Sequence, residues 1–122
     1  MVRPPAPLRI AIVGPCAAGK STLARGLQAH GYDARQIVQE HSYVPQMWAL
    51  ITRPDRLIYL DASHAVCTRR KALSWSPAEH AEQLRRLAHA RAHCHVYLQT
   101  DGLTPQQVLE AVLAQLPRRA GG

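Results

Sequence analysis

The segment GPCAAGKST, residues 14–22, has the residue types and the spacing of a loop that binds phosphate groups. Gly14, Gly19, Lys20 and Ser21 fit the pattern G-x-x-x-x-G-K-[ST]. The glycines have no Cβ atom, so the backbone can turn sharply and approach an anion. The amides of such a loop, with the amino-terminal end of a following helix, then surround phosphate oxygens. We therefore expect a binding site for a polyphosphate.

The motif also predicts individual roles. Lys20 can reach the β- and γ-phosphates of a nucleotide, and the Ser21 hydroxyl can bind Mg²⁺. Cys16 lies inside the loop, where it is either a thiol activated by the helix terminus or simply a small residue. The nucleotide-binding residues expected in this segment are Gly14, Cys16, Ala17, Ala18, Gly19, Lys20, Ser21 and Thr22.

Two carboxylates follow apolar stretches that are typical of strands. Glu40 comes after Ile37 and Val38, and Asp61 ends the run RLIYLD. Either carboxylate could hold Mg²⁺, directly or through water, at the carboxyl edge of a parallel sheet. Asp61 has an alternative role as the cap of the helix that follows it. Glu40 has no such alternative, which favours it as the metal ligand or general base. The candidate metal ligands are therefore Ser21, Glu40 and Asp61.

The chain is strongly basic, with a formal net charge of +7, and only Lys20 and Lys71 of its 15 basic residues are lysines. Much of the charge lies between residues 69 and 91. Such a stretch can bind a triphosphate or the phosphates of a nucleic acid, or it can form a solvated helix face. Charge alone does not choose among these three possibilities.

A short cluster, HARAHCH, places His89 and His93 four residues apart, followed by Cys94 and His95. These residues could begin a zinc site, but no second cluster completes a tetrahedral ligand set. Histidines and arginines also suit the carboxyl-terminal end of a helix.

Length and composition set the broad class. A chain of 122 residues predicts a single domain, with residues 1–7 and 118–122 as flexible tails. No apolar run approaches the roughly 18 residues that span a membrane. The three cysteines are odd in number and widely spaced, which argues against a disulfide framework and favours the cytoplasm. We expect a monomer or homodimer without membrane attachment.

Hydrophobic periodicity predicts strands and helices in alternation. Gly31 ends the first helix, Pro45 opens a short one, and Ser76 and Thr104 begin capping boxes. The predicted strands cover residues 8–13, 35–39, 56–61 and 95–99, and the longer helices cover residues 20–30, 64–73, 77–93 and 105–116.

This alternation predicts an α/β fold, a three-layer α/β/α sandwich around a short, four-stranded parallel sheet. Right-handed crossovers on both sides of the first strand give the order 2-1-3-4. In such a sheet the ligand lies at the carboxyl ends of the strands, beside the first strand.

The segment IAIVGPCAAGKSTLARGL resembles the first strand, loop and helix of the P-loop kinases, which phosphorylate nucleosides, nucleotides and small metabolites, as adenylate and thymidylate kinases do. PDRLIYLDASHAVCTRR is similar to the part of these kinases that leads into their lid, and YLQTDGLTPQQVLEAVLAQL is similar to their last strand and helix. The resemblance touches most of the chain. It implies the P-loop NTPase fold, ATP and Mg²⁺ as ligands, and phosphoryl transfer as the reaction.

The resemblance also implies roles outside the loop. Arg69 and Arg70 would stabilise the phosphoryl group in transfer, and Glu40 would activate the acceptor hydroxyl. Thr100, Asp101 and Gly102 would lie near the base. The implied catalytic residues are Lys20, Glu40, Arg69 and Arg70.

The chain departs from these kinases in one region. They usually have five strands and a helical insertion for the acceptor, whereas here only SYVPQMWALITRP stands in that place. Because a nucleotide acceptor would be cramped, a small hydroxyl compound or a nucleoside is expected. Tyr43, Met47 and Trp48 form either a shelf for such a ring or part of the core.

Three functions remain open at this point. The first is a kinase that transfers the γ-phosphate of Mg·ATP to a small hydroxyl compound. The second is a nucleotide-binding sensor or regulatory module without transfer, with slow NTP hydrolysis at most. The third is association with nucleic acid through the arginine-rich stretch, which is the least supported because few aromatic residues are present for stacking on bases.

Overall fold

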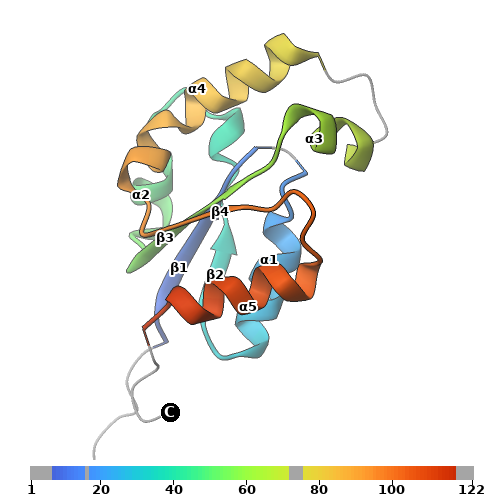
Figure 1. Ribbon diagram of the computed structural model, residues 1–122. Coiled ribbons are helices and arrows are strands. Elements are labelled where there is room, and N and C mark those ends of the chain that lie inside the picture. The colour runs from blue at the N-terminus through green and yellow to red at the C-terminus, as the bar shows by residue number, and fades with distance from the viewer. Residues whose placement is uncertain (1–6, 16, 72–75, 118–122) are drawn as a thin grey trace, which may run out of the picture.

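The computed structural model describes residues 7–15, 17–71 and 76–117, and of Lys71 only the backbone (Figure 1). The predicted tails, apart from Pro7, and Cys16 lie outside these residues. The strands are β1 (Arg9–Val13), β2 (Asp33–Gln36), β3 (Arg56–Asp61) and β4 (Val96–Gln99). The helices are α1 (Lys20–Ala29), the 3-10 turn η1 (Gln39–His41), α2 (Met47–Thr52), α3 (His64–Lys71), α4 (Pro77–His93) and α5 (Pro105–Gln115).

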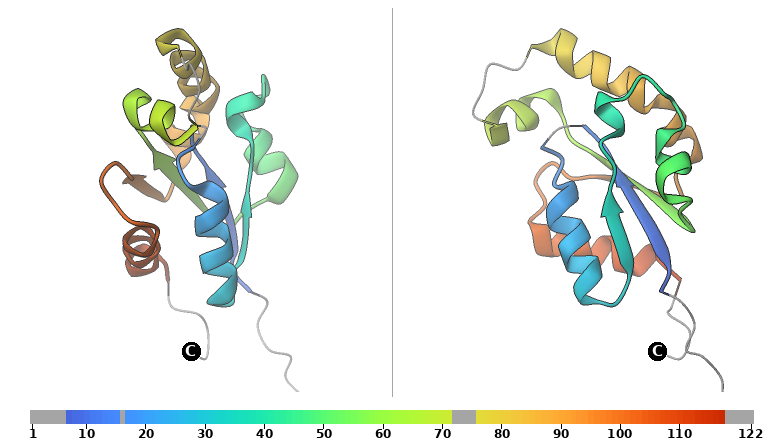
Figure 2. Two further views of the ribbon diagram at one scale, coloured as in Figure 1. Left: turned by 90° about the vertical axis from the view of Figure 1, so that its right-hand side faces the viewer. Right: turned by 180° about the vertical axis from the view of Figure 1, so that it is seen from behind.

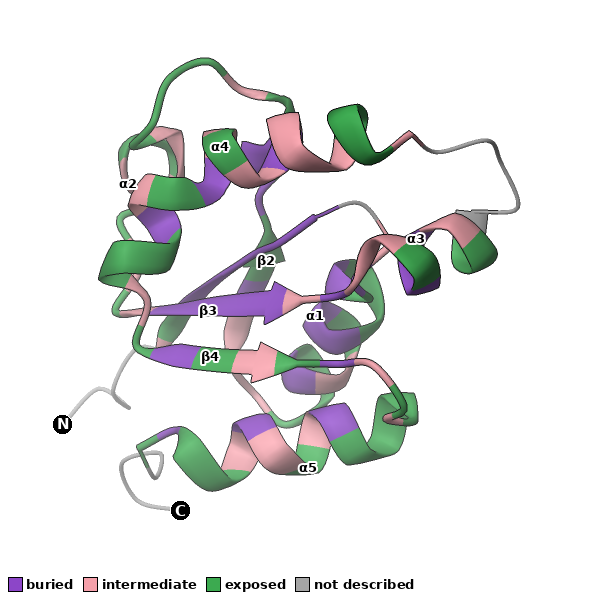
Figure 3. Cartoon of the chain, turned by 45° about the horizontal axis from the view of Figure 1, so that its top comes forward, coloured by how far each residue is buried: buried purple, intermediate pink, exposed green. Residues whose placement is uncertain are grey.

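The four strands form one parallel sheet in the order β2-β1-β3-β4, as predicted. α1 and α5 cover one face of the sheet, and α2 and α4 cover the other, so the described fold has three layers (Figures 1 and 2). The two central strands are the most buried (Figure 3). They are apolar at nearly every position because both of their faces are covered by helices.

The core has two parts, one on each side of the sheet. On one side Ile10, Ile12 and Leu60 pack with Leu27 of α1 and Val112 of α5. The part on the other face consists of Ala11, Val13, Ile37, Leu57, Tyr59, Leu87 and Ala90. Residues that alternate along β1 and β3 therefore face different helices, which fixes the register of the sheet.

Local signals in the sequence place several helix ends correctly. Gly31 has φ 88°, its N–H donates to the Gln28 carbonyl, and the chain leaves α1 there. Ser76 accepts a hydrogen bond from the Glu79 amide at the start of α4. Thr104 and Gln107 form a complete capping box at the start of α5.

The prediction for the second strand was wrong by two residues at its start and by three at its end. β2 covers Asp33–Gln36 and not 35–39, because it starts immediately after the Gly31 turn and pairs Asp33 with Arg9. Ala34 supplies its buried position, which an apolar pattern based on larger side chains misses. The Ile37 amide makes a last bond to the Ile12 carbonyl before the chain turns into η1.

Two other element predictions also need correction. Pro45 is not the first residue of α2, because the helix begins at Met47 with Gln46 as its N-cap. Asp61 does not act as the cap of α3, because the Ser63 hydroxyl accepts the hydrogen bond from the Val66 amide. None of the helices in the described residues is long and apolar enough to cross a membrane.

Candidate functional site

The loop between β1 and α1 lies where a parallel sheet places its ligands, at the carboxyl edge of the central strands. Gly14 has φ 154°, and a Cβ atom there would lie 2.0 Å from the Leu60 carbonyl oxygen of β3. Ala17 (φ 67°) and Gly19 (φ 97°) are both left-handed. The loop therefore turns tightly against β3 and depends on the two glycines of the motif.

Backbone donors are present at the start of α1. The Ala18 amide donates to the Pro15 carbonyl, 3.2 Å away. Among the described residues, the amides of Gly19, Lys20 and Ser21 have no hydrogen-bond partner, as expected for the first turn of a helix. Gly19 and Ser21 are exposed residues, so the start of α1 lies at the surface, where an anion could approach it.

Lys20 is directed into the loop and is only 6% exposed. Its Nζ donates to the Gly14 carbonyl at 2.9 Å, to the Pro15 carbonyl at 3.1 Å and to Oε2 of Glu40 at 2.7 Å. Glu40 is 2% exposed, and its Oε1 is buried without a hydrogen-bond partner in the described part of the chain. Two residues predicted to be catalytic thus form one buried ion pair.

Gln39, the residue before Glu40, positions η1. Its side chain is completely buried and bonds in three directions. Nε2 donates to the carbonyls of Val44 and Arg86, and Oε1 accepts from the Trp48 amide. This amide side chain joins η1 to α2 and α4, which limits how far Glu40 can move.

Arg86 of α4 contacts the same turn. Its Nη1 donates to the Glu40 carbonyl at 3.4 Å, and its guanidinium lies 4.3 Å from the centre of the Tyr43 ring. Its Nε lies 3.3 Å from Oε1 of Glu82, an ion pair without the geometry of a hydrogen bond. Arg86 therefore supports the backbone of η1 and is engaged on several sides.

The third candidate metal ligand, Asp61, is engaged by neighbours. Oδ1 accepts from the Ala62 amide, and Oδ2 accepts from the Tyr97 hydroxyl of β4. Tyr97 stacks on Tyr59, with ring centres 5.6 Å apart. Burial raises the pKa of both tyrosines, and the charge of Asp61 raises each further. Asp61 is thus a hydrogen-bond acceptor for β4, and it is less free for a cation than Glu40.

A cavity of about 360 Å³ opens beside the loop. One wall is the loop and the start of α1, and the other is the segment between β4 and α5 with the first turns of α5. Its lining is mainly apolar, with threonine hydroxyls and one guanidinium. The lining residues are Ala17, Ala18, Gly19, Thr22, Leu23, Arg70, Thr100, Leu103, Pro105 and Val108.

The predicted base-binding segment borders this cavity, but its polar side chains are already bonded. Thr100 is 1% exposed, and its hydroxyl donates to the Asp61 carbonyl at 3.0 Å. Asp101 accepts from the Ser63 amide at 3.1 Å. Burial opposes ionisation of Asp101, but the hydrogen bonds from Ser63 and Gln99 outweigh it and lower its pKa. The amides of Asp101 and Leu103 also have partners inside the protein, in Gln99 and Thr100. This segment therefore offers backbone carbonyls and an apolar surface to a ligand.

Arg69 and Arg70 are both exposed on α3, and they differ in their contacts. Nη1 of Arg70 donates to the Ala17 carbonyl at 2.9 Å, which joins α3 to the loop. The other arginines of the basic stretch have separate partners: Arg85 pairs with Glu82, and Arg91 lies over the Tyr97 ring. The positive charges of the described arginines in this stretch are therefore spread over several separate contacts with other groups.

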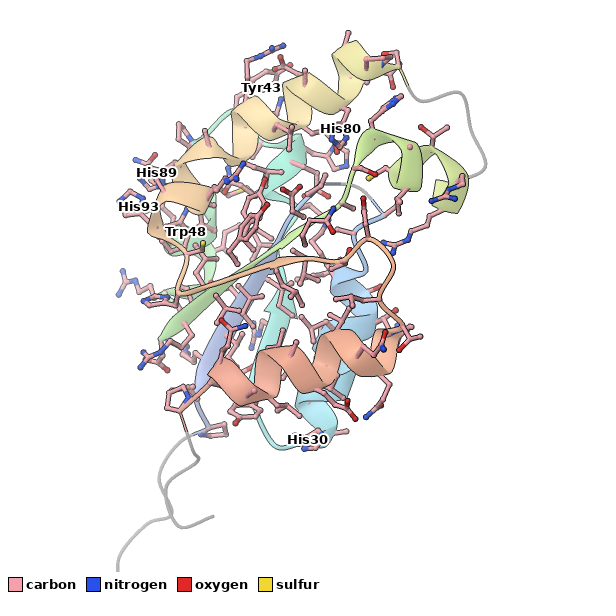
Figure 4. The ribbon with its side chains drawn as sticks, in the orientation of Figure 1. His30, Tyr43, Trp48, His80, His89 and His93 are labelled. Carbon is pink, nitrogen blue, oxygen red and sulfur yellow. The ribbon has the colours of Figure 1, made fainter. Side chains whose placement is uncertain are left out.

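Trp48 and Met47 are half-buried and pack against the core on the side of the sheet that α4 covers, which favours a packing role over a ring-binding shelf. Its indole donates to His89, which stacks on His93 (Figure 4). Tyr43 is 82% exposed and lies apart from them. Within the described residues, no group of three His, Cys, Asp or Glu side chains could hold a metal ion.

Gln39 and Tyr97 were not among the residues predicted from the sequence, and neither was the contact of Arg86 with η1. Their roles depend on contacts between distant segments, so no local pattern marks them. Leu103 and Val108 could have been predicted as apolar neighbours near the start of α5, because the capping box at Thr104 places them on either side of that start. Comparison of the chain with models of protein families and with curated proteins gives no match.

Proposed function

We propose that this chain is a P-loop protein that binds Mg·ATP and transfers its γ-phosphate to a small hydroxyl compound. The arrangement that supports the proposal is the motif loop between β1 and α1, with Lys20 inside it and a cavity of about 360 Å³ beside it. The polyphosphate would lie on the amides at the start of α1, and the base would enter the cavity.

Residues on both walls would bind the nucleotide. The amides of Gly19 and Ser21, two exposed residues, would donate to phosphate oxygens. Leu103 and Val108 would pack against the base, and backbone carbonyls of the segment 101–103 would accept hydrogen bonds from its edge. Arg70, which lines the same cavity, would bring its charge to the phosphates from α3.

The oxygen atoms near the loop fit Mg²⁺. The Ser21 hydroxyl lies at the exposed start of α1, and Glu40 has a buried carboxylate oxygen without a partner among the described residues. Magnesium bound to the phosphates would supply neutralisation of their charge during transfer. Asp61 is a weaker candidate because both of its oxygens accept hydrogen bonds.

Glu40 would take the proton of the acceptor hydroxyl, and Arg69 and Arg70 would stabilise charge on the phosphoryl oxygens. An open groove of about 380 Å³ runs along the first half of α4 beside His41, the neighbour of Glu40. Its arginine, Arg86, is already bound to Glu82 and to the Glu40 carbonyl. Because this arginine is already engaged, the groove favours an acceptor that carries hydroxyl groups and no phosphate.

The first experiment is titration calorimetry of the full chain with Mg·ATP and Mg·GTP. The Lys20→Ala variant should lose at least about tenfold in affinity, because an ammonium–phosphate contact is removed. Arg25→Ala, which removes an exposed positive charge from the same helix, is the matched control and should bind as the unaltered chain does. Absence of binding by the unaltered chain would contradict the proposal.

Transfer is tested separately by ADP release with glycerol, ribose, adenosine and AMP as acceptors. We expect release stimulated by an uncharged hydroxyl compound and lost in Glu40→Ala. Nucleotide binding without stimulated release by any of them would instead support a binding module without transfer chemistry.

A further inference from the structure

The Lys20 ammonium has three hydrogen-bond donors, and all three have acceptors within the protein. Two acceptors are backbone carbonyls of the loop, at Gly14 and Pro15, and the third is the Glu40 carboxylate. A phosphate oxygen that contacts Nζ must therefore displace one of them.

Glu40 is the acceptor that a phosphate is expected to displace. Both side chains of the pair are buried, at 6% and 3% exposed, so the charges are poorly screened by water. A carboxylate 2.7 Å from Nζ repels the phosphate that approaches the same atom, whereas the two carbonyls carry no net charge.

Displacement changes what Glu40 can do. Its Oε1 already lacks a partner among the described residues, and loss of Lys20 would leave Oε2 without its ammonium. A buried carboxylate without a partner is costly, so it must take a proton, a hydroxyl donor or a cation. Gln39 and Arg86 hold the turn against α4, which opposes movement of Glu40 into water.

We propose that Glu40 is an internal competitor of the nucleotide for Lys20, and that it becomes free to receive an acceptor hydroxyl or a cation only after phosphate has taken Lys20. This inference rests on the proposed nucleotide binding. It adds that binding is ordered, with the nucleotide before the acceptor. It also means that the ion pair lowers the affinity of the loop for bare polyphosphate.

The test is calorimetry with pyrophosphate and with ATP, each in excess EDTA, which isolates the competition from any cation at Glu40. Glu40→Gln keeps the size of the side chain and removes its charge. It should bind both probes about tenfold more tightly than the unaltered chain, since one charge-assisted contact no longer opposes them. Glu110→Gln removes an equal charge from the exposed face of α5, and its affinity should not change.

If the unaltered chain binds ATP but Glu40→Gln binds it equally or more weakly in EDTA, the inference is overturned. The proposed nucleotide binding would stand in that case. Failure of both proteins to bind ATP, with and without Mg²⁺, would overturn the proposed function and this inference with it. Thermal unfolding of each variant is measured first. If Glu40→Gln does not fold, Glu40→Asp replaces it, because the shorter carboxylate reaches Lys20 less well and should give a smaller gain in affinity.

Discussion

Arg70 of α3 donates a hydrogen bond to the carbonyl oxygen of Ala17, 2.9 Å away, and both residues line the cavity. Ala17 has φ 67°, a left-handed conformation that is unfavourable for a residue with a Cβ atom. The arginine thus supports a loop residue with an unfavourable backbone conformation, and it links α3 to the loop between β1 and α1.

Replacement of Arg70 should therefore weaken nucleotide binding through both its charge and this bond. We expect Arg70→Ala to lower the affinity for Mg·ATP by about tenfold and Arg70→Lys to recover only part of it, because a lysine cannot reproduce the planar guanidinium contact. Calorimetry measures both variants, with Arg25→Ala as the charge control. Equal affinity of Arg70→Ala and the unaltered chain would show that α3 does not contribute to the site.

Gly14 and Gly102 both have positive φ, but replacement by alanine should lower the free energy of unfolding by different amounts at the two positions. A Cβ atom at Gly14 would meet the Leu60 carbonyl at 2.0 Å, whereas none of the described atoms lies within 4 Å of one at Gly102. Gly102→Ala should cost about 1 kcal/mol from backbone strain alone. Gly14→Ala should cost about 3 kcal/mol or more, because β1 and β3 must separate. Urea unfolding compares the two, and similar losses would contradict the close approach of β3 to the loop.

The features predicted from the sequence are those that local chemistry determines. The turn from β1 into α1, the Gly31 helix end and the caps at Ser76 and Thr104 each depend on residues within a few positions of one another. The second strand was misplaced because its buried position is the small Ala34, and the larger Ile37 lies beyond its end.

Contacts between distant segments could not be predicted in this way. Tyr97 meets Asp61 because β3 and β4 pair Tyr59 with Tyr97, which places the hydroxyl beside a carboxylate two residues further along. The pairing of Lys20 with Glu40 likewise depends on the η1 turn. This turn was not predicted, because the strand expected at 35–39 overlaps its first residue.

Glu40 and Asp61 should differ in their effect on magnesium. Glu40→Gln should reduce the gain in ATP affinity that Mg²⁺ gives, because its free carboxylate oxygen is removed. Asp61→Asn should leave that gain close to its original size and instead lower the free energy of unfolding by about 1 kcal/mol, through the weakened bond to Tyr97. Calorimetry with and without Mg²⁺ separates the two, and loss of the gain in Asp61→Asn would make Asp61 the metal ligand.

His80 of α4 should make the protein less stable in mild acid. Its ring packs edge-on against His64 of α3, with centres 5.7 Å apart, and its Nδ1 is buried without a hydrogen-bond partner among the described residues (Figure 4). Burial lowers the pKa of His80 below 6.5, and His64 lowers it further, although the charge of Asp61 acts in the opposite direction. The unfolded chain therefore binds this proton more readily than the folded chain, so the free energy of unfolding should fall as the pH decreases below about 6.5.

Urea unfolding at about pH 7.5 and about pH 5.5 should show a smaller decrease in His80→Gln than in the unaltered chain. An equal decrease in both proteins would mean that the proton responsible binds elsewhere.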